Sequence, residues 1–241
     1  QGGEKEKVRY IIMADSGKAE IKFENGDKYV GEVSNSKLNG FGVYTFANGS
    51  KYEGQFKDDK FDGYGEFIDV MQNHYKGEFV SGRRNGRGTL IISRLGKYVG
   101  DFEDDKMQGQ GILNYEDGAV YTGAFKNNKR HGTGMYKFPE NDLSSRSYKG
   151  DHHENKFHGT GMLVLKDGST YDGDFRNNLM NGKGVLLYPD GTRYTGDFVK
   201  NIKEGRGMIQ YPNGDIYEGT VSKDAIQGQG KYTYGTITKK S

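Results

Sequence analysis

The chain has 241 residues with 35 basic and 33 acidic side chains, a formal net charge of +2 and no cysteine. This charge balance argues against a nucleic-acid partner, and the absence of cysteine excludes disulfides, thiolate metal sites and a cysteine nucleophile. Hydrophobic residues make up only 32% of the chain, less than an ordinary globular core needs, and no apolar run approaches the ~18 residues of a membrane span.

A tandem repeat marked by tyrosine dominates the sequence. The spacing from Tyr29 to Tyr52 recurs in seven of the eight intervals between marker tyrosines, and the interval from Tyr121 to Tyr148 is four positions longer. The markers are Tyr29, Tyr52, Tyr75, Tyr98, Tyr121, Tyr148, Tyr171, Tyr194 and Tyr217. Glycines follow each marker at three fixed offsets, and an aromatic or apolar residue follows four positions later, with His152 as the exception. A fixed period of this length indicates a repeat array.

The unit that begins at Tyr171 shows the expected local structure. Residues 171–175 alternate in polarity, as a strand does, and 176–181 form a polar segment that predicts a six-residue turn. Residues 184–188 alternate again, and Asp190-Gly191 supplies the positive φ of a tight turn. Each unit is therefore predicted to be one β-hairpin.

The glycines predict how the rings pack. A large ring needs bare backbone beside it, so each ring should lie over neighbouring glycines. No second layer is encoded, and the predicted fold is all-β: an elongated, curved and twisted single-layer antiparallel β-hairpin repeat array. Residues 1–28 are predicted to be an N-terminal segment with a degenerate capping repeat over 8–26, in which Tyr10 takes the phenylalanine position. Residues 29–241 hold nine units and a short tail, and the extra residues of the long interval fall within 139–147.

The pattern Tyr-x-Gly-x-Phe followed by Gly-x-Gly resembles the MORN repeat, the "membrane occupation and recognition nexus" module. It is carried, for example, by 52–56 with Gly63 and Gly65, and the resemblance covers 29–234. Tryptophan, frequent in the family at the phenylalanine position, is absent. The resemblance implies an array that grips a partner segment in a groove or dimerises. It also implies a setting in ciliary or cytoskeletal proteins, or beside catalytic domains such as lipid kinases and SET-type lysine methyltransferases.

The aromatic face is the first candidate site. If glycines cannot bury every ring, the exposed rings form a groove for an extended or helical peptide segment, because aromatic side chains dominate binding hot spots. The predicted groove residues are Tyr98, Phe102, Tyr121, Phe125, Tyr171, Phe175 and Tyr194.

The opposite face is the second candidate, because its second strands carry apolar residues. These are Ile112, Met135, Met162, Val164, Val185, Leu187 and Met208. A contiguous exposed apolar patch usually marks a partner site. The alternative is that these side chains only support cross-strand packing.

A basic ladder is the third candidate, for anionic lipid headgroups. Its residues are Lys60, Arg83, Arg84, Arg87, Lys106 and Lys129. Acidic residues such as Asp58 and Asp104 share the same turns, so the alternative is a solvated edge.

No catalytic, cofactor or metal site is predicted. The Gly-x-Gly pairs lack the third glycine of a dinucleotide loop, and no nucleophile–base set is evident. His152, His153 and His158 lie within one hairpin, but successive strand residues point to opposite faces, so His152 and His153 should diverge.

The sequence thus favours a non-catalytic protein–protein interaction scaffold or adaptor with a protein partner. The polar start of the chain does not have the pattern of a signal peptide, which favours a cytoplasmic protein, associated with the cytoskeleton, a cilium or a membrane structure. Two alternatives stay open: a peripheral array that binds phosphoinositide or other anionic lipid, and the accessory domain of a larger enzyme. Self-association is a further alternative.

Overall fold

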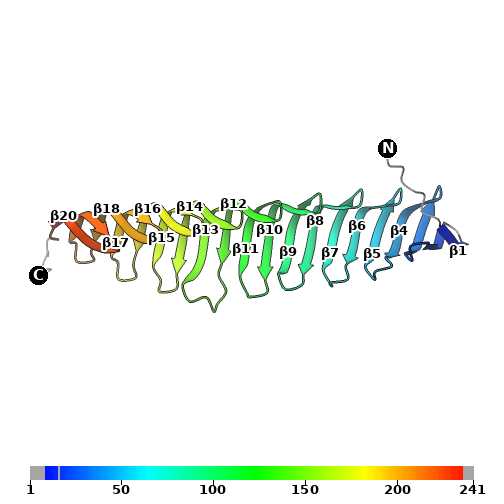
Figure 1. The fold of residues 1–241 in the computed structure, drawn as a ribbon, viewed down its shortest axis with the longest axis horizontal. Helices are drawn as coiled ribbons and strands as arrows, with labels where there is room; N and C mark the ends of the chain where they lie inside the picture. Colours follow the sequence, from blue (N-terminus) through cyan, green and yellow to red (C-terminus); the bar gives the residue numbers. More distant parts are fainter. Residues whose placement is uncertain (1–8, 16, 236–241) are drawn as a thin grey trace, which may run out of the picture. The chain divides into compact units, whose positions relative to one another are not determined.

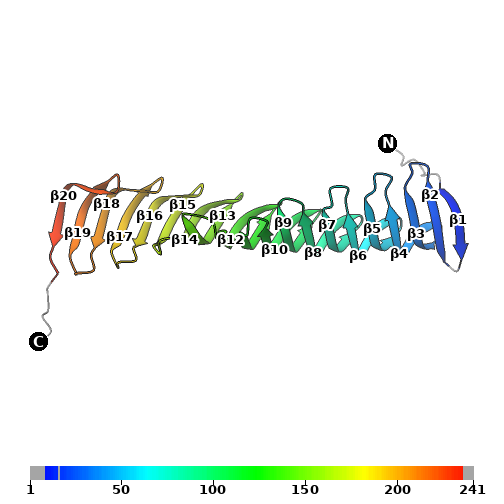
Figure 2. The same cartoon turned by 90° about the horizontal axis from the view of Figure 1, so that it is seen from below.

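In a computed structural model of the chain, residues 9–15 and 17–235 are described, with side chains from residue 17 onward. The chain divides into two compact units, Gln1–Glu116 (unit 1) and Asp117–Ser241 (unit 2). Within each unit the strands follow one another in chain order (Figures 1 and 2).

Unit 1 contains ten strands: β1 (Arg9–Asp15), β2 (Lys18–Phe23), β3 (Lys28–Ser34), β4 (Lys37–Thr45), β5 (Lys51–Lys57), β6 (Lys60–Ile68), β7 (His74–Val80), β8 (Arg83–Ile92), β9 (Gly96–Glu103) and β10 (Lys106–Tyr115). Unit 2 contains ten more: β11 (Val120–Lys126), β12 (Lys129–Lys137), β13 (Ser145–His153), β14 (Lys156–Leu165), β15 (Thr170–Arg176), β16 (Leu179–Leu187), β17 (Arg193–Val199), β18 (Ile202–Gln210), β19 (Ile216–Ser222) and β20 (Ala225–Thr233).

Each strand pairs antiparallel with its chain neighbours inside its unit, as β5 does with β4 and β6, and β15 with β14 and β16. No helix occurs in the described part of the chain. Consequently, residues 9–15 and 17–235 provide no helix that meets the requirements of a membrane span. The prediction of an all-β, single-layer antiparallel hairpin repeat array is confirmed.

The hairpin turns are shorter than predicted. In the repeat that begins at Tyr171, only Asn177 and Asn178 lie between the two strands, with φ of 52° and 70°. Two consecutive positive φ values are typical of a type I′ hairpin turn. Leu179 and Met180 pair with the first strand, and a bulge then shifts the register. The prediction of a six-residue turn was wrong because Arg176, Leu179 and Met180 are already paired in the ladder.

The marker tyrosines form the core of each hairpin. Eight of the nine are at most 1% exposed and Tyr217 is 5% exposed. Each hydroxyl donates to the backbone carbonyl three residues later, at 2.7–3.0 Å. Each ring also lies over two repeat glycines: a Cβ added to Gly123 would lie 2.7 Å from Tyr121 Oη and 2.5 Å from the Cα of Gly134. The predicted packing of rings on glycine is confirmed.

Neighbouring hairpins are joined by rings and by turn side chains. Within each unit, where the following repeat carries a phenylalanine, its ring meets the marker tyrosine edge-on, as Phe175 meets Tyr148 with centroids 4.9 Å apart. In addition, a turn Asp or Asn accepts a hydrogen bond from the previous hairpin, as Asn201 Oδ1 does from the Met180 amide at 2.8 Å. Both kinds of contact recur between successive hairpins of unit 1 and of unit 2, so each hairpin stabilises its neighbours.

The long interval enlarges one connection. Residues 138–144 join β12 to β13, and this loop reaches further from the sheet than the others (Figure 1). Asp142 organises it by accepting hydrogen bonds from the Ser144 and Ser145 amides at 2.8 and 2.7 Å. At the other end of the chain, β1 pairs with β2, and Ala19, Ile21 and Phe23 are buried. The side chain of Tyr10 lies outside the described residues, so the capping repeat remains a prediction.

Candidate partner-binding surface

The rings predicted to line an open groove are buried. Tyr98, Tyr121 and Tyr171 have 0% exposure, and Tyr194 has 1%. The phenylalanines of the same set, Phe102, Phe125 and Phe175, are 3–4% exposed. The expectation that these rings are exposed was wrong, because neighbouring residues cover them: Tyr171, for example, lies over Gly173 and Gly184 and meets Phe175 and Phe198 edge-on with centroids 5.1 and 4.9 Å apart.

The outer layer of the aromatic face in unit 2 is a set of half-buried apolar side chains. These pack on the buried core of the unit and are Tyr136, Phe138, Leu163, Met180, Tyr188, Ile209 and Tyr211. We call this set the apolar row. Sequence reasoning missed it, although its signal is present: except for Met180, its members stand at two fixed offsets from a marker tyrosine, as Tyr136 and Phe138 do from Tyr121.

Two cations lie along the apolar row. The Lys203 ammonium donates to Tyr188 Oη at 2.9 Å and lies 5.3 Å from the centre of that ring. The Arg130 guanidinium lies 4.5 Å from the centre of the Tyr136 ring. Such contacts place positive charge against aromatic faces. The row is therefore apolar, with one basic side chain beside it at Tyr136 and another at Tyr188.

A hollow of about 510 Å³ opens in the same face of unit 2. Its walls include Tyr136, Phe138, Leu163 and Met180 of the apolar row, together with Arg130. Serines of the enlarged connection, Ser144 and Ser145, and turn asparagines also reach it. The hollow therefore combines an apolar wall with several polar groups, as ligand sites usually do.

Unit 1 carries a similar outer layer. Phe46, Phe61 and Phe67 are half-buried, and their rings meet edge-on with centroids 6.0–6.3 Å apart. In this unit the cation is Arg84, over the rings of Tyr75 and Phe102 at 5.6 Å. Its Nε donates to Asp105 Oδ1 at 3.1 Å, so this guanidinium has a carboxylate partner.

A family model of the MORN repeat matches nine consecutive segments: 29–51, 52–73, 75–93, 98–120, 121–143, 148–170, 171–193, 194–216 and 217–236. The chain belongs to the MORN repeat family. No curated protein sequence matches the chain.

Among solved structures, the fold of this MORN chain resembles the TCP10 domain of CPAP from Danio rerio, solved in complex with a peptide of Danio rerio STIL. The two are 15% identical over 95% of this chain and 99% of that chain, with a TM-score of 0.53. The SAS-4 (dCPAP) TCP domain of Drosophila melanogaster, in complex with a proline-rich motif of Ana2 (dSTIL), is 13% identical over 87% and 93% of the two chains, with a TM-score of 0.30. The first likeness shows the fold alone, and the second adds no argument.

The opposite face of the MORN sheet does not form the continuous apolar patch that was predicted. In unit 2, Met162 lies between Lys149 and Asp172 of the flanking strands, and Met208 lies between Thr195 and Glu218. The remaining apolar residues of this face in unit 2 are Met135, Val164, Val185 and Leu187, of which Met135 and Leu187 are 47% and 44% exposed. Ile112 of unit 1 pairs with Val99, which is also exposed. Polar strands thus interrupt the apolar ones.

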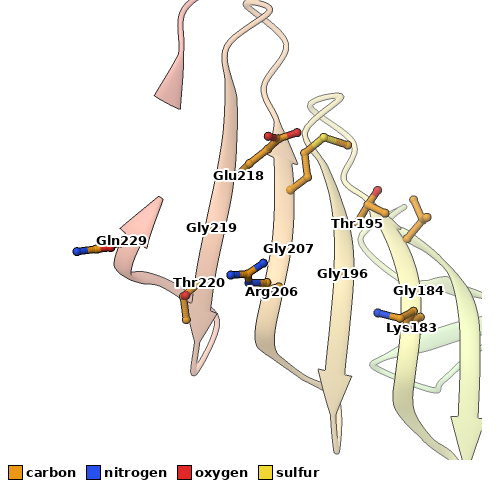
Figure 3. A pocket seen from close by; sticks show the side chains of 12 residues that line it. Lys183, Gly184, Thr195, Gly196, Arg206, Gly207, Glu218, Gly219, Thr220 and Gln229 are labelled. Carbon is orange, nitrogen blue, oxygen red and sulfur yellow. The ribbon is translucent and has the colours of Figure 1, made fainter. Parts of the chain in front are cut away.

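A shallow hollow of about 750 Å³ lies on this opposite face of unit 2. Val185 and Met208 line it together with polar side chains. Figure 3 shows Lys183, Arg206 and Thr220 carried into it by β16, β18 and β19. Lys183 pairs with Asp197 at 2.9 Å.

The basic ladder is largely neutralised. Arg83 pairs with Asp104 at 3.2 Å and Lys129 with Glu154 at 3.2 Å, each across neighbouring turns. Arg87 pairs with Asp101 at 3.3 Å, and Arg84 belongs to the aromatic face. Lys60 and Lys106 begin β6 and β10 and are exposed. The paired carboxylates weaken the field that such an edge presents to an anionic surface.

The histidines lie on two faces, as predicted for His152 and His153. His152 is buried between the rings of Tyr121 and Tyr148, with centroids at 4.9 and 5.2 Å. Burial, followed by the Arg130 charge, lowers the pKa of His152 to about 4, so the ring is neutral. His153 is exposed, with its ring 5.1 and 5.6 Å from those of His131 and His158. Over the described residues, no group of three or more His, Cys, Asp or Glu is arranged to hold a metal ion.

Proposed function

We propose that this MORN chain is a non-catalytic protein-interaction scaffold that binds a partner segment along the apolar row of unit 2. The observation that carries the proposal is the apolar row itself: seven apolar side chains lie half-buried on one face, over a floor of buried tyrosines. Apolar surface that is left open to solvent usually marks a partner site.

The repeat spacing favours a long partner over a small molecule. The members of the row come from successive hairpins, β11–β12 to β17–β18 and the connections that follow them. Strands in a sheet lie ~4.8 Å apart, so an extended or helical segment can meet several hairpins at once. The likeness of the fold to the CPAP domain, which was solved with a bound peptide, supports this choice.

The chemistry of the row sets the expected salt dependence. Most of its contact surface is apolar, and the Lys203 ammonium is already held by Tyr188 at 2.9 Å. Binding should therefore weaken little between low and high ionic strength. Attachment to anionic lipid through the basic ladder would be strongly screened by salt.

Two neighbouring residues allow a matched test. Tyr188 belongs to the row, whereas Leu187, one residue earlier, is exposed on the opposite face. With a partner purified from the native cell on the immobilised chain, we expect Tyr188→Ser to weaken its affinity by about tenfold or more, as loss of a ring at a hot spot does. Leu187→Ser should leave the affinity unchanged at low and high salt.

The reverse pattern, with loss only in Leu187→Ser, would contradict the proposal. Sedimentation with vesicles that contain phosphoinositide tests the lipid alternative: binding that is abolished by Lys129→Glu and by high salt would favour it. We further propose that the scaffold acts in the cytoplasm, at the cytoskeleton or a membrane-associated structure; localising a fluorescently tagged chain in the native cell tests this.

A further inference from the structure

Two arginines occupy the same position of the repeat, nine residues after a marker tyrosine, but in different electrostatic surroundings. Arg84 donates through Nε to the Asp105 carboxylate at 3.1 Å and through Nη2 to the Asp105 carbonyl at 2.8 Å. Arg130 makes the same backbone contact, from Nη2 to the carbonyl of Asn155 at 2.6 Å. The turn residue, however, is an asparagine, so the carboxylate is missing.

Arg130 therefore has no carboxylate partner, and its charge is met only by the Asn155 carbonyl and by the face of the Tyr136 ring, whose centre lies 4.5 Å away. Its Nε and Nη1 are buried and have no hydrogen-bond partner, and within residues 17–235 no carboxylate lies at ion-pair distance from it. Two acidic side chains of the adjoining segments, Glu154 next to Asn155 and Asp142 of the β12–β13 connection, are engaged elsewhere: Glu154 pairs with Lys129 at 3.2 Å, and Asp142 caps the Ser144 and Ser145 amides. A guanidinium that buries two N–H groups without a carboxylate is costly, and an anion beside it offsets that cost.

The position of Arg130 gives such an anion a place. Arg130 lines the hollow of about 510 Å³, where Tyr136 and Phe138 lie on one side and Leu163 and Met180 on another. The enlarged connection between β12 and β13 contributes Ser144 and Ser145 to the wall. The hollow thus combines one unpaired cation with an apolar wall, which suits an acidic group followed by an apolar one.

We propose that this hollow is a specificity pocket for the partner segment: Arg130 takes a carboxylate side chain of the segment, and the apolar wall takes the hydrophobic side chain next to it. The inference rests on the proposed function and specifies the chemistry of the partner. A phosphate-bearing ligand would address the same guanidinium, and it becomes an outcome of the test.

The probes are two isosteric dipeptides, acetyl-Glu-Phe-amide and acetyl-Gln-Phe-amide, titrated against the full chain labelled with ¹⁵N and with methyl groups in Leu and Met. The Nε–H signal of Arg130 and the methyl signals of Leu163 and Met180 report on the hollow. We expect all three to shift with the acidic peptide, and the neutral peptide to bind about tenfold more weakly, since a charged hydrogen bond is lost. Inorganic phosphate is the third probe.

Two variants remove the unpaired charge by different routes. Asn155→Asp places a carboxylate where Asp105 stands for Arg84 and keeps the turn oxygen that accepts from the Arg130 amide at 2.9 Å. Arg130→Met removes the cation, and methionine fits the slot, since Met107 and Met180 occupy it in other units. Both should weaken the acidic peptide by about tenfold and leave the neutral one unchanged. Arg84→Met in unit 1 is the matched control and should change neither.

The pocket is contradicted if the two dipeptides bind equally, if neither shifts the three signals, or if Asn155→Asp binds the acidic peptide as the wild type does. Phosphate that shifts the Arg130 signal more strongly than the acidic peptide would replace the carboxylate assignment. The proposed function is tested separately. If the acidic dipeptide binds but Tyr188→Ser does not weaken the partner, the pocket is supported and the apolar row is contradicted as the partner-binding surface. If Tyr188→Ser weakens the partner but neither dipeptide binds, the apolar row is supported and the pocket is contradicted.

Discussion

Replacing His152 by phenylalanine tests how the ring ladder is built. His152 stands four residues after Tyr148, where most other units have phenylalanine. It is 3% exposed, and its Nδ1 donates to the Gly150 carbonyl at 3.1 Å. Its Nε2 is buried and without a hydrogen-bond partner. Phenylalanine would keep the edge-on contacts with Tyr121 and Tyr148 and remove this unpaired nitrogen.

The expected gain at neutral pH is modest. Removing a buried unpaired polar group is worth about 1–3 kcal/mol, and losing the hydrogen bond to Gly150 costs about 0.5–1.5 kcal/mol. We therefore expect His152→Phe to raise the free energy of unfolding by about 1 kcal/mol at pH 7.5.

The gain should grow as the pH falls. The pKa of His152 is lowered to about 4 in the folded chain, by burial first and by the Arg130 charge second, whereas an unfolded histidine has a pKa near 6.5. The unfolded state therefore binds the extra proton first, and wild-type stability falls as the pH drops from about 6.5 towards 4. At pH 5.5 this loss amounts to about 1.4 kcal/mol, which the phenylalanine variant does not suffer.

Urea unfolding of both proteins, followed by circular dichroism at pH 7.5 and pH 5.5, measures these two quantities. His153→Phe, at an exposed position beside it, controls for the general effect of removing an imidazole. A stability difference that is the same at both pH values, or a destabilised His152→Phe, would refute the account of a neutral buried ring.

Three further outcomes are expected. Gly123→Val should lower the free energy of unfolding by about 1–3 kcal/mol, because its side chain would displace the Tyr121 ring; an unchanged melting temperature would contradict the packing of rings on glycine. Tyr171→Phe should cost about 0.5–1.5 kcal/mol in urea unfolding, because the Asp174 carbonyl loses its donor at 3.0 Å; equal stability would show that the hydroxyl is dispensable. Lys129→Glu, which breaks an exposed pair with Glu154, should leave the melting temperature and partner affinity unchanged, and a large loss of either would restore a role for the basic ladder.

The fold follows from the sequence because its signals are local and repeated. Alternating polarity fixes the strands, and two glycines of each unit leave space for the marker ring, as Gly173 and Gly184 do for Tyr171. Turn length was less predictable, because polar residues such as Arg176 and Asn181 look like turn residues. Arg176 instead pairs with Leu179, and Asn181 lies in β16 at the bulge that follows Met180. Polar residues tolerate an exposed strand edge, so composition cannot separate a turn from a bulged strand.

The candidate surface depends on how deeply each side chain of the aromatic face is buried, and a periodic sequence pattern does not encode this. Tyr171 and Tyr188 belong to the same unit and both lie on the aromatic face, yet the first is 0% exposed and the second is half-buried. The difference arises because side chains from elsewhere in the repeat cover the first ring. The lack of a carboxylate partner for Arg130 is harder still to predict. It depends on residue 155 being an asparagine rather than an aspartate, and this residue lies 25 positions away in the next turn.

The most direct test of the central claim is site-specific photo-crosslinking. A benzophenone amino acid is placed at position 188 or 211, in the apolar row, and at position 187 or 162, exposed on the opposite face. After irradiation with the purified partner, we expect adducts from positions 188 and 211, mapped by mass spectrometry to one continuous partner segment, and none from 187 and 162. Adducts that form only at 187 and 162 would contradict the claim that the partner lies along the apolar row.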